Sequence, residues 1–552
     1  MAQQKYQGNL SAAAFPFATI LKGPSVIVPN RDQSSGPYRD FSGATTQLGM
    51  NIAQLYYAEN IIPTNEGYKS VGYNPFIGAA TGFTGIFREI FTVFDGRSNK
   101  ALIGVTSTHE IWILSAYTSG AWSKITLPDA ATWTDGILTE GSVFGVVYIN
   151  LQGLGVYVYD IPTNAFTKAT VIGATDSDFI GITSSTSYLI AYDPISVIWS
   201  STEDPLDFTP SIITGAGGGT PDSLKGQIVY CKEISKGFIV YSSVMIIAAT
   251  YSGNLQYPWV FNPLANGSGI ASPDDVINNI DISSQWAWTA AGLLEVTIQY
   301  CTPKFPEVTD FLAAGILEVY SPESKLVSTS YTEVPFKKKL SSVGNRYLCI
   351  SYGLTIDGND SPLTYSLIYD SMLKRWGKLK NPHLQIFEIT ADTSGLGLTW
   401  TASAPNEWED YPVAWSSLVS FGNTPAQAKK TFGFLHADGS IEYVDFTYGD
   451  TSAAGVAIFG KFQLTRTSVC TMEEIEIQSA IDAQNENFAL SVQSTENTYT
   501  INSPVLSPTL YNADEGYRRY DAHVTGQNHS LVFEGAFSLV SYVLTLHNSG
   551  RR

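Results

Sequence analysis

Charged residues and cysteines are both scarce in this chain. Only 15% of its 552 residues are charged, whereas an average soluble domain has about 25%. The cysteines are widely separated and form no CxxC pair, which argues against a disulfide framework and against a structural zinc site. We therefore expect reduced, buried thiols and folding in a cytoplasm. The four cysteines are Cys231, Cys301, Cys349 and Cys470.

Long apolar runs are absent as well. No apolar stretch reaches the length of about 18 residues that a membrane-spanning helix needs. The apolar stretch 12–21 is short, contains Pro16 and follows no basic segment, so it does not resemble a secretory signal peptide. We expect no membrane partner.

Basic residues are outnumbered by acidic ones, 31 to 50, which gives a net charge of −19. A surface this acidic repels phosphate, so stable binding of duplex DNA is not expected. Two interpretations of the charge stay open. It can keep the protein soluble, or it can form a surface that nucleic acid passes without adhering.

What the chain does have is short runs in which apolar and polar residues alternate. Its 12% aromatic residues and 47 glycines also favour strands and turns. A period of two places one face of a strand on a core and the other toward solvent. Examples are residues 294–300, 474–478 and 488–493. Helical periodicity is confined to residues 46–60, 306–319 and 425–432. The sequence therefore predicts an all-β protein.

One motif recurs, in which an aromatic residue follows a Tyr-Asp pair six positions after the aspartate. We interpret it as a hairpin: the aspartate opens the turn and the later aromatic residue returns beside the tyrosine. Repeated hairpins of this kind are typical of propeller blades. Their irregular spacing argues against a regular WD40 or kelch array and predicts a divergent β-propeller of six or seven blades. The alternative is a generic set of hairpins in several β domains. The motif occurs at residues 159–166, 192–199 and 369–376.

Three domains are predicted from the distribution of these signals. Residues 1–62 are mixed in character and are expected to form an N-terminal arm or lead-in. Residues 63–447 are expected to form the β-propeller. A small, polar stretch at 447–455 marks a boundary. The strand-like runs beyond it predict a C-terminal β-sandwich over residues 448–552.

The residue types that usually carry catalysis show no diagnostic spacing. The histidines form no HExxH or other metal-binding pattern, and no GxSxG elbow is present. The glycine-rich stretch 214–220 lacks the lysine-serine ending of a phosphate-binding loop, so we interpret it as a loop between strands. No residue is therefore predicted to be catalytic, to bind a cofactor or to hold a metal. The six histidines are His109, His383, His436, His523, His529 and His547.

Acidic and aromatic residues leave two alternatives open. A carboxylate pair could hydrolyse a glycoside if the two groups lay about 5–10 Å apart, and Asp204, Asp207, Glu307 and Asp310 have aromatic neighbours. The stretch nearest to a sialidase Asp-box, residues 494–499, lacks both the aspartate and the glycine. Exposed tryptophans could stack on sugars, but the favoured interpretation is that they fill blade cores. The clusters are Trp286 with Trp288, and Trp400 with Trp408 and Trp415.

Several segments, taken in chain order, carry a family resemblance. They are NIAQLYYAEN at 51–60, VIWSS at 197–201, KGFIVY at 236–241, GSGIASPDDV at 267–276, FPEVTDF at 305–311 and RWG at 375–377. In this order they resemble the hub or nozzle proteins of podovirus tails, of the packaged-DNA stabilisation type. The likeness covers most of residues 50–450, and the C-terminal hundred residues match that family in strand pattern only.

The resemblance implies a non-enzymatic structural protein of a short bacteriophage tail, assembled in the host bacterial cytoplasm. Its subunits would form a homo-oligomeric ring, expected to be six-fold, which continues the DNA channel and retains the genome until ejection. The implied partners are adaptor or portal-side proteins, tail fibre or tip proteins, and double-stranded DNA that passes without specific binding. No cofactor is implied. A host-surface glycan-binding module and a propeller-type glycoside hydrolase remain the alternatives.

Overall fold

The computed structural model describes most of the chain from Leu55 onward and a short N-terminal strand. The described residues are 4–9, 55–64, 67–94, 100–114, 121–128, 131–279, 283–313, 315–331, 336–344, 346–353, 362–391, 429–445, 455–462, 468–479, 487–496, 499–502, 504–512 and 516–551.

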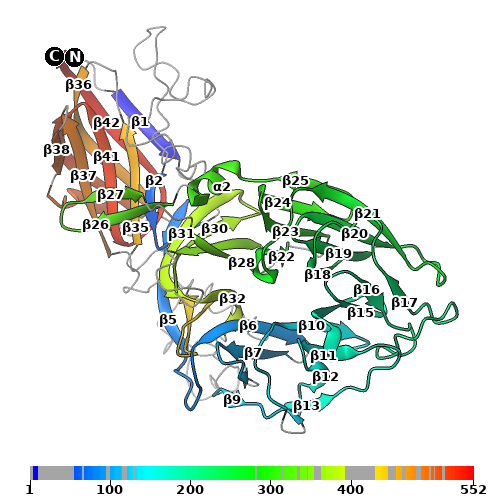
Figure 1. Cartoon of the computed structure of the whole chain (residues 1–552). Helices are drawn as coiled ribbons and strands as arrows, with labels where there is room; N and C mark the ends of the chain where they lie inside the picture. The colour runs from blue at the N-terminus through cyan, green and yellow to red at the C-terminus, as the bar shows by residue number, and fades with distance from the viewer. Residues whose placement is uncertain are drawn as a thin grey trace, which may run out of the picture.

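Seven antiparallel groups of four strands make up a β-propeller in the described part of the chain (Figure 1). At most blade boundaries the first strands of the two blades contact each other, so these strands lie nearest the axis. Blades 1 to 3 are β6 (Phe87–Phe94), β7 (Lys100–Thr106), β8 (Ile111–Leu114) and β9 (Ser123–Lys124); β10 (Leu138–Val143), β11 (Val146–Leu151), β12 (Gly155–Asp160) and β13 (Ala165–Lys168); and β14 (Gly181–Ser185), β15 (Tyr188–Tyr192), β16 (Val197–Trp199) and β17 (Gly217–Gly219).

The remaining blades follow the same outward order. Blades 4 to 6 are β18 (Ile228–Ile234), β19 (Gly237–Ser242), β20 (Met245–Tyr251) and β21 (Trp259–Asn266); β22 (Val276–Asn278), β23 (Ser284–Thr289), β24 (Gly292–Thr297) and β25 (Cys301–Pro303); and β28 (Lys337–Val343), β29 (Tyr347–Gly353), β30 (Leu363–Asp370) and β31 (Arg375–His383). Blade 7 consists of β32 (Gln385–Ala391), β33 (Lys429–Leu435), β34 (Ile441–Asp445) and β5 (Gly72–Ile77). Because β5 precedes blade 1 in the chain, its pairing with β34 closes the ring.

Hydrophobic side chains fill the spaces between adjacent blades. Blades 3 and 4, for example, enclose a cluster that includes Tyr188, Phe238 and Trp259, and blades 1 and 2 enclose one that includes Ile113 and Ile149. Each blade is thus covered on both faces. This explains why strands such as β8, β15 and β19 are buried along their whole length. The prediction of a divergent β-propeller is confirmed.

The Tyr-Asp motif forms the expected hairpin in two of its three copies. Tyr159 pairs with Phe166 in the turn from β12 to β13, with ring centroids 4.9 Å apart. Tyr369 pairs with Trp376 in the equivalent turn of blade 6, at 5.0 Å. The third copy differs, because the turn after Asp193 is tighter and Trp199 lies opposite Ile190 between the second and third strands of blade 3.

A β-sandwich completes the described structure, as the sequence predicts. One sheet contains β2 (Leu55–Glu59), β35 (Gly455–Phe462), β41 (Asn528–Ala536), β37 (Asn487–Glu496) and β38 (Tyr499–Asn502). The other contains β4 (Tyr68–Ser70), β42 (Ser538–Arg551), β36 (Ser468–Ser479), β40 (Tyr517–Gly526) and β39 (Leu510–Asn512), and β1 (Gln4–Asn9) also pairs with β42. Apolar side chains such as Phe459, Phe533 and Tyr542 fill the core between the sheets.

The sandwich and the propeller share one sheet. Strand β3 (Ile61–Pro63) pairs with β31 of blade 6 on one side and with β4 on the other, and β4 pairs with β42. An eleven-stranded sheet therefore runs from the axis of the propeller through blade 6 into the sandwich. At the crossing, a side chain on Gly377 would meet the carbonyl oxygen of Ile61 at 2.5 Å, so only glycine fits there.

An insertion between blades 5 and 6 strengthens this junction. Helix α2 (Pro306–Ala313) leads into a hairpin of β26 (Ile316–Ser321) and β27 (Leu326–Tyr331). The hairpin covers the outer face of the first sandwich sheet, where Tyr320 stacks on Tyr57 with ring centroids 5.9 Å apart.

These pairings divide the chain differently from the predicted boundaries. Residues 55–62, predicted to belong to an arm, supply β2 and most of β3, and residues 68–70, predicted to belong to the propeller, supply the sandwich strand β4. The propeller is thus inserted between two parts of the sandwich. Local alternation identifies a strand but not a partner several hundred residues away, which explains the difference.

Three local predictions also need correction. The segments 46–60 and 425–432 contribute strands β2 and β33 where they are described, because a short apolar run fits a buried strand as well as a helix. Of the third helical segment, only α2 is helical before β26 begins. The glycine-rich stretch contains the edge strand β17 rather than a loop alone.

Candidate functional site

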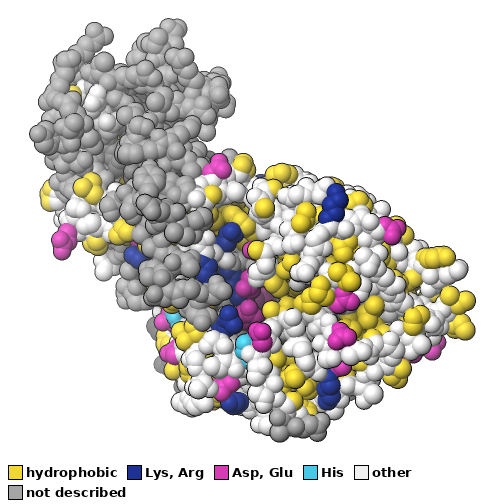
Figure 2. Space-filling model, viewed as in Figure 1, with side chains coloured by type: hydrophobic (Ala, Val, Ile, Leu, Met, Phe, Trp, Pro, Cys, Tyr) yellow, Lys and Arg dark blue, Asp and Glu magenta, His cyan; other side chains and the backbone are white. Residues whose placement is uncertain are grey.

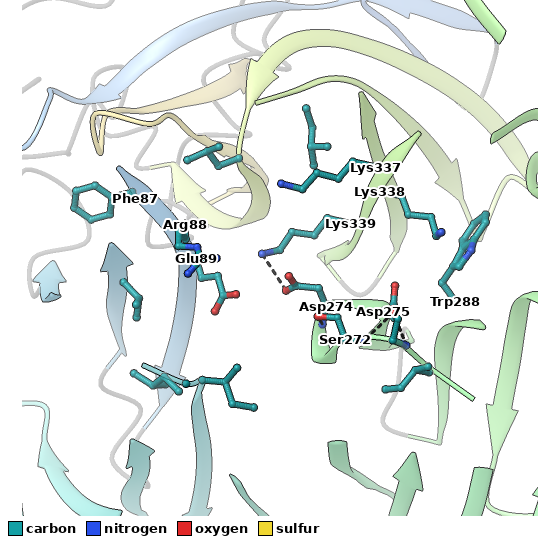
Figure 3. A pocket seen from close by; sticks show the side chains of 18 of the residues that line it. Phe87, Arg88, Glu89, Ser272, Asp274, Asp275, Trp288, Lys337, Lys338 and Lys339 are labelled. Atoms are coloured by element: carbon teal, nitrogen blue, oxygen red, sulfur yellow. Dashed lines mark hydrogen bonds and ion pairs between the residues drawn. The ribbon is translucent and has the colours of Figure 1, made fainter. Parts of the chain in front are cut away.

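A cavity of about 780 Å³ lies at one end of the propeller axis. Residues from blades 1, 2, 4, 5 and 6 and from the links between blades line it (Figure 3). Its charged lining residues are Arg88, Glu89, Asp135, Asp274, Asp275, Lys337, Lys338 and Lys339. Basic and acidic side chains are equal in number here, so the cavity is balanced in charge although the whole chain is strongly acidic.

Lys339 is the centre of the first charge network in this cavity. It lies on β28, is only 10% exposed, and its Nζ is 3.0 Å from Oδ1 of Asp274. Glu89 projects from β6 toward the same pair (Figure 3). Burial opposes the charged form of Lys339, but Asp274 and Glu89 outweigh it and raise the pKa of the lysine. Burial also raises the pKa of Glu89, against the attraction of Lys339. The network links blades 1 and 6 to the connection between blades 4 and 5.

Lys338 and Asp275 form a second, adjacent network. The Nζ of Lys338 lies 4.8 Å from the centroid of the Trp288 ring, a cation–π contact. The Asp275 carboxylate accepts hydrogen bonds from the backbone N–H groups of Ala271 and Ser272, at 3.1 and 3.0 Å, and so caps the 3₁₀ turn η4 (Pro273–Asp275). Burial lowers the pKa of Lys338 and raises that of Asp275. Trp288 is thereby held by its neighbours rather than presented to solvent.

A third group of charges comes from the first strands of blades 2 and 4. Glu140 of β10 has an exposed side chain, and the charge of Lys232 favours its ionised form. Lys232 lies 5.4 Å from the centroid of the Tyr230 ring. Glu233, whose pKa is raised by burial, accepts a hydrogen bond from the Ser184 hydroxyl at 3.1 Å.

Buried charges also lie at the junction between the propeller and the sandwich. Lys378 of β31 is 3% exposed, and its Nζ lies 3.7 Å from the Glu318 carboxylate of the inserted hairpin. The rings of Tyr57 and Tyr365 contact the same ammonium group, with centroids at 4.9 and 4.8 Å. Burial lowers the pKa of Lys378 and raises that of Glu318, so the pair is held by geometry against the cost of desolvation.

The four carboxylates considered for glycoside hydrolysis serve local structure where their contacts are described. Asp204 accepts a hydrogen bond from the Leu206 N–H at 2.9 Å, and Asp207 accepts one from the Thr209 N–H at 2.9 Å. These contacts belong to a turn of blade 3, whereas Glu307 and Asp310 lie on α2 beyond blade 5. The structure does not bring the two pairs onto one blade.

Two of the histidines and two of the candidate tryptophans are buried. His383 and His529 are buried, one in the propeller and one in the sandwich, and burial lowers both pKa values to about 4. Trp286 and Trp288 are only 6% and 7% exposed, as expected of core residues. Trp400, Trp408 and Trp415 lie outside the described residues. All four cysteines are free, and Cys231, Cys349 and Cys470 are buried.

The axial charge networks were not predicted from the sequence. The sequence contains two charged runs, Lys337-Lys338-Lys339 and Asp274-Asp275. A run of charges normally indicates a solvated face. Only the closed ring brings the two segments together. Among the described residues there is no group of three or more His, Cys, Asp or Glu side chains placed to hold a metal ion. In the same part of the chain, no helix has the length and apolarity needed to cross a membrane.

Comparisons with known proteins add little beyond the fold. No family model and no curated protein matches the chain. Among the solved structures that are similar is the crystal structure of the β-propeller domain of Cps50 (Swd1) from Myceliophteria thermophila. That match has 9% sequence identity and a TM-score of 0.38, and it covers 68% of this chain and all of the other. The assignment of a propeller rests on the strand pairing described above.

Proposed function

We propose that this chain is a structural subunit of a short bacteriophage tail, of the hub or nozzle type, and that its copies form a ring around the DNA path. The observation that carries the proposal is the eleven-stranded sheet that joins the propeller to the sandwich. A backbone ladder across a domain boundary resists relative motion far better than a contact between surfaces would, which suits a part that transmits force. The order of the segments that resemble podovirus tail proteins supports the same proposal.

The charge distribution is compatible with a DNA conduit. Net charge is −19, so phosphate finds no general attraction to the protein surface. The lysines that gather at the axial cavity are matched by carboxylates, and Lys339 is paired with Asp274. DNA would therefore pass copies of this chain without being retained by them. An acidic surface would both keep the protein soluble and prevent DNA from adhering to it.

Electron microscopy of the purified full-length chain tests the proposal. Negatively stained particles should include closed rings of copies, and the proportion of rings should rise with protein concentration. A duplex DNA fragment should show no retardation on a native gel with the protein at about 150 mM salt. Particles that stay monomeric at every concentration, or tight binding of duplex DNA, would contradict it. Release of soluble sugar from a host polysaccharide would instead support the hydrolase alternative.

A further inference from the structure

Two apolar patches lie at opposite ends of the described molecule. The first, the tip patch, consists of Ile212 and Ile213 in the turn after β16 and Leu255 and Tyr257 in the turn after β20. Ile213 is 78% exposed and Tyr257 is 66% exposed, which is unusual for side chains of this size. Figure 2 shows hydrophobic side chains at the right-hand end of the propeller, where Figure 1 draws the loops beyond β17 and β21.

The second, the sandwich patch, consists of Val505, Leu510 and Tyr511, all more than half exposed. These residues lie in and beside the loop from β38 to β39, and Figure 1 places β38 at the end of the molecule far from β17 and β21.

The turns of the tip patch are held by their own hydrogen bonds. The Ser211 hydroxyl accepts from the backbone N–H groups of Ile213 and Thr214, at 3.3 and 3.4 Å, and the Trp199 indole N–H donates to the Gly215 carbonyl at 2.8 Å. In the neighbouring turn, the Asn254 side chain accepts from the Gln256 N–H at 2.9 Å. The apolar side chains are thus presented on fixed backbone, which lowers the entropy lost on binding.

The sandwich patch is anchored in the same way. The Leu506 N–H donates to the Leu490 carbonyl at 2.8 Å, and the Thr509 N–H donates to the Arg519 carbonyl at 2.7 Å. The guanidinium of Arg518 lies 4.8 Å from the centroid of the Tyr511 ring and holds it in place.

The residues of both patches come from sequence stretches without charged side chains, and Arg518, which packs on Tyr511, comes from the neighbouring strand. Residues 208–221, 250–273 and 497–513 contain no Asp, Glu, Lys, Arg or His, in a chain whose net charge is −19. Two copies of so acidic a protein repel each other over most of their surfaces. Contact between copies is least opposed where charges are absent and apolar area can be buried.

From this arrangement we infer that the tip patch of one copy docks on the sandwich patch of the next. Different patches at opposite ends make a head-to-tail contact, which repeats from copy to copy and closes into a ring when the rotation permits. The exposed aromatic residues Tyr257 and Tyr511 are of the type that dominates binding energy at interfaces. The inference rests on the proposed ring function for its biological setting, and it names the surfaces that build the ring.

Disulfide trapping between copies tests this contact. Three variants of the full-length chain are needed, Ile213→Cys, Val505→Cys and the double variant, with the unaltered chain as a control for its own four cysteines. Under mild oxidation the double variant should give a ladder of dimers, trimers and larger species on a non-reducing gel. A mixture of the two single variants should give dimers, and neither single variant alone should give any.

The outcomes separate the inference from the proposed function. If the unaltered chain forms rings but the double variant gives no ladder, the contact is wrong and the ring remains. If Ile213→Cys crosslinks by itself, the tip patch meets its own copy and the head-to-tail arrangement is overturned. A chain that stays monomeric at all concentrations overturns both.

An affinity measurement gives an independent test of the same contact. Replacing Ile213 and Tyr257 together with Asp should weaken association by about 100-fold or more in sedimentation experiments, while the circular dichroism spectrum stays unchanged because both side chains are exposed. Unweakened association of this variant would contradict the inference.

Discussion

The propeller and the sandwich are built from the chain in opposite ways. Six of the seven blades consist of strands that follow one another directly, so almost all of their pairing is local. The sandwich instead combines β2 and β4, near the start of the described core, with strands that begin only at Gly455. The sandwich thus holds together the two ends of the propeller segment. The smaller sandwich therefore keeps the larger propeller closed.

Core substitutions should show most strongly whether the sandwich and the propeller unfold as one cooperative unit. Phe238 and Phe533 are fully buried, one in blade 4 and one in the sandwich. Replacing either with Ala should lower the free energy of unfolding by about 3–5 kcal/mol. Because the two modules share a sheet, both variants should shift the same single transition in differential scanning calorimetry. Two transitions, each sensitive to one variant, would show that the modules unfold independently.

The junction ion pair offers the next largest effect. Lys378→Met leaves Glu318 buried without its cation, so the free energy of unfolding should fall by about 3 kcal/mol in chemical denaturation. Changing Glu318 to Leu in the same chain should restore most of the loss, because two apolar groups need no partner. The control is Lys380→Met, since Lys380 is 37% exposed and its pair with Glu59 should contribute less than about 1 kcal/mol. Equal losses for both lysines would contradict the burial argument.

The two buried histidines should make both modules sensitive to acid. Burial lowers the pKa of His383 and of His529 to about 4, whereas an unfolded histidine has a pKa of about 6.5. The unfolded chain therefore binds more protons between these values, and stability falls as pH drops from about 6.5 to about 4. The loss is at most about 3 kcal/mol for each histidine.

Separate variants assign this acid sensitivity to each module. His383→Gln and His529→Gln should each flatten the dependence of melting temperature on pH between about 4 and 6.5, although His383→Gln also disturbs the contact to the Ser351 hydroxyl at 2.8 Å. An unchanged pH slope in both variants would show that other groups cause the acid sensitivity.

The smallest effect tests the shared sheet directly. Gly377→Ala places a methyl group 2.5 Å from the Ile61 carbonyl oxygen, which should push β31 and β3 apart and cost about 1–3 kcal/mol. Gly219→Ala is the matched control, because nothing lies within 4 Å of the added atom. Hydrogen exchange should quicken in β3 and β4 of the first variant only. Identical exchange in the two variants would mean that the sheet tolerates the insertion.

The sequence predicts the local parts of this structure far better than the distant ones. The Tyr159-Asp160 and Tyr369-Asp370 hairpins, and the alternating strands of the sandwich, are correctly predicted because their information lies within a few residues. The sandwich strands β2 and β4 are missed, since a strand's partner is decided by the whole fold.

The candidate site is harder still to predict. Apart from the run of lysines in which it lies, nothing local distinguishes Lys339, which is 10% exposed, from an ordinary surface lysine. Its burial follows from the closure of the propeller, which brings Asp274 beside it. An unusual run of lysines at the start of a strand is the one signal that could have indicated the network.

Closure of the propeller by β5 has a consequence for synthesis on the ribosome. The strand emerges early, but its partner β34 begins only at Ile441. At about 5–20 residues per second, β5 waits about 20 to 70 seconds for that partner. Throughout this time the growing array of blades has open edges, which invite pairing with other nascent chains. The cell that makes the protein must therefore protect an unfinished propeller, and yield should depend on translation speed and chaperone supply.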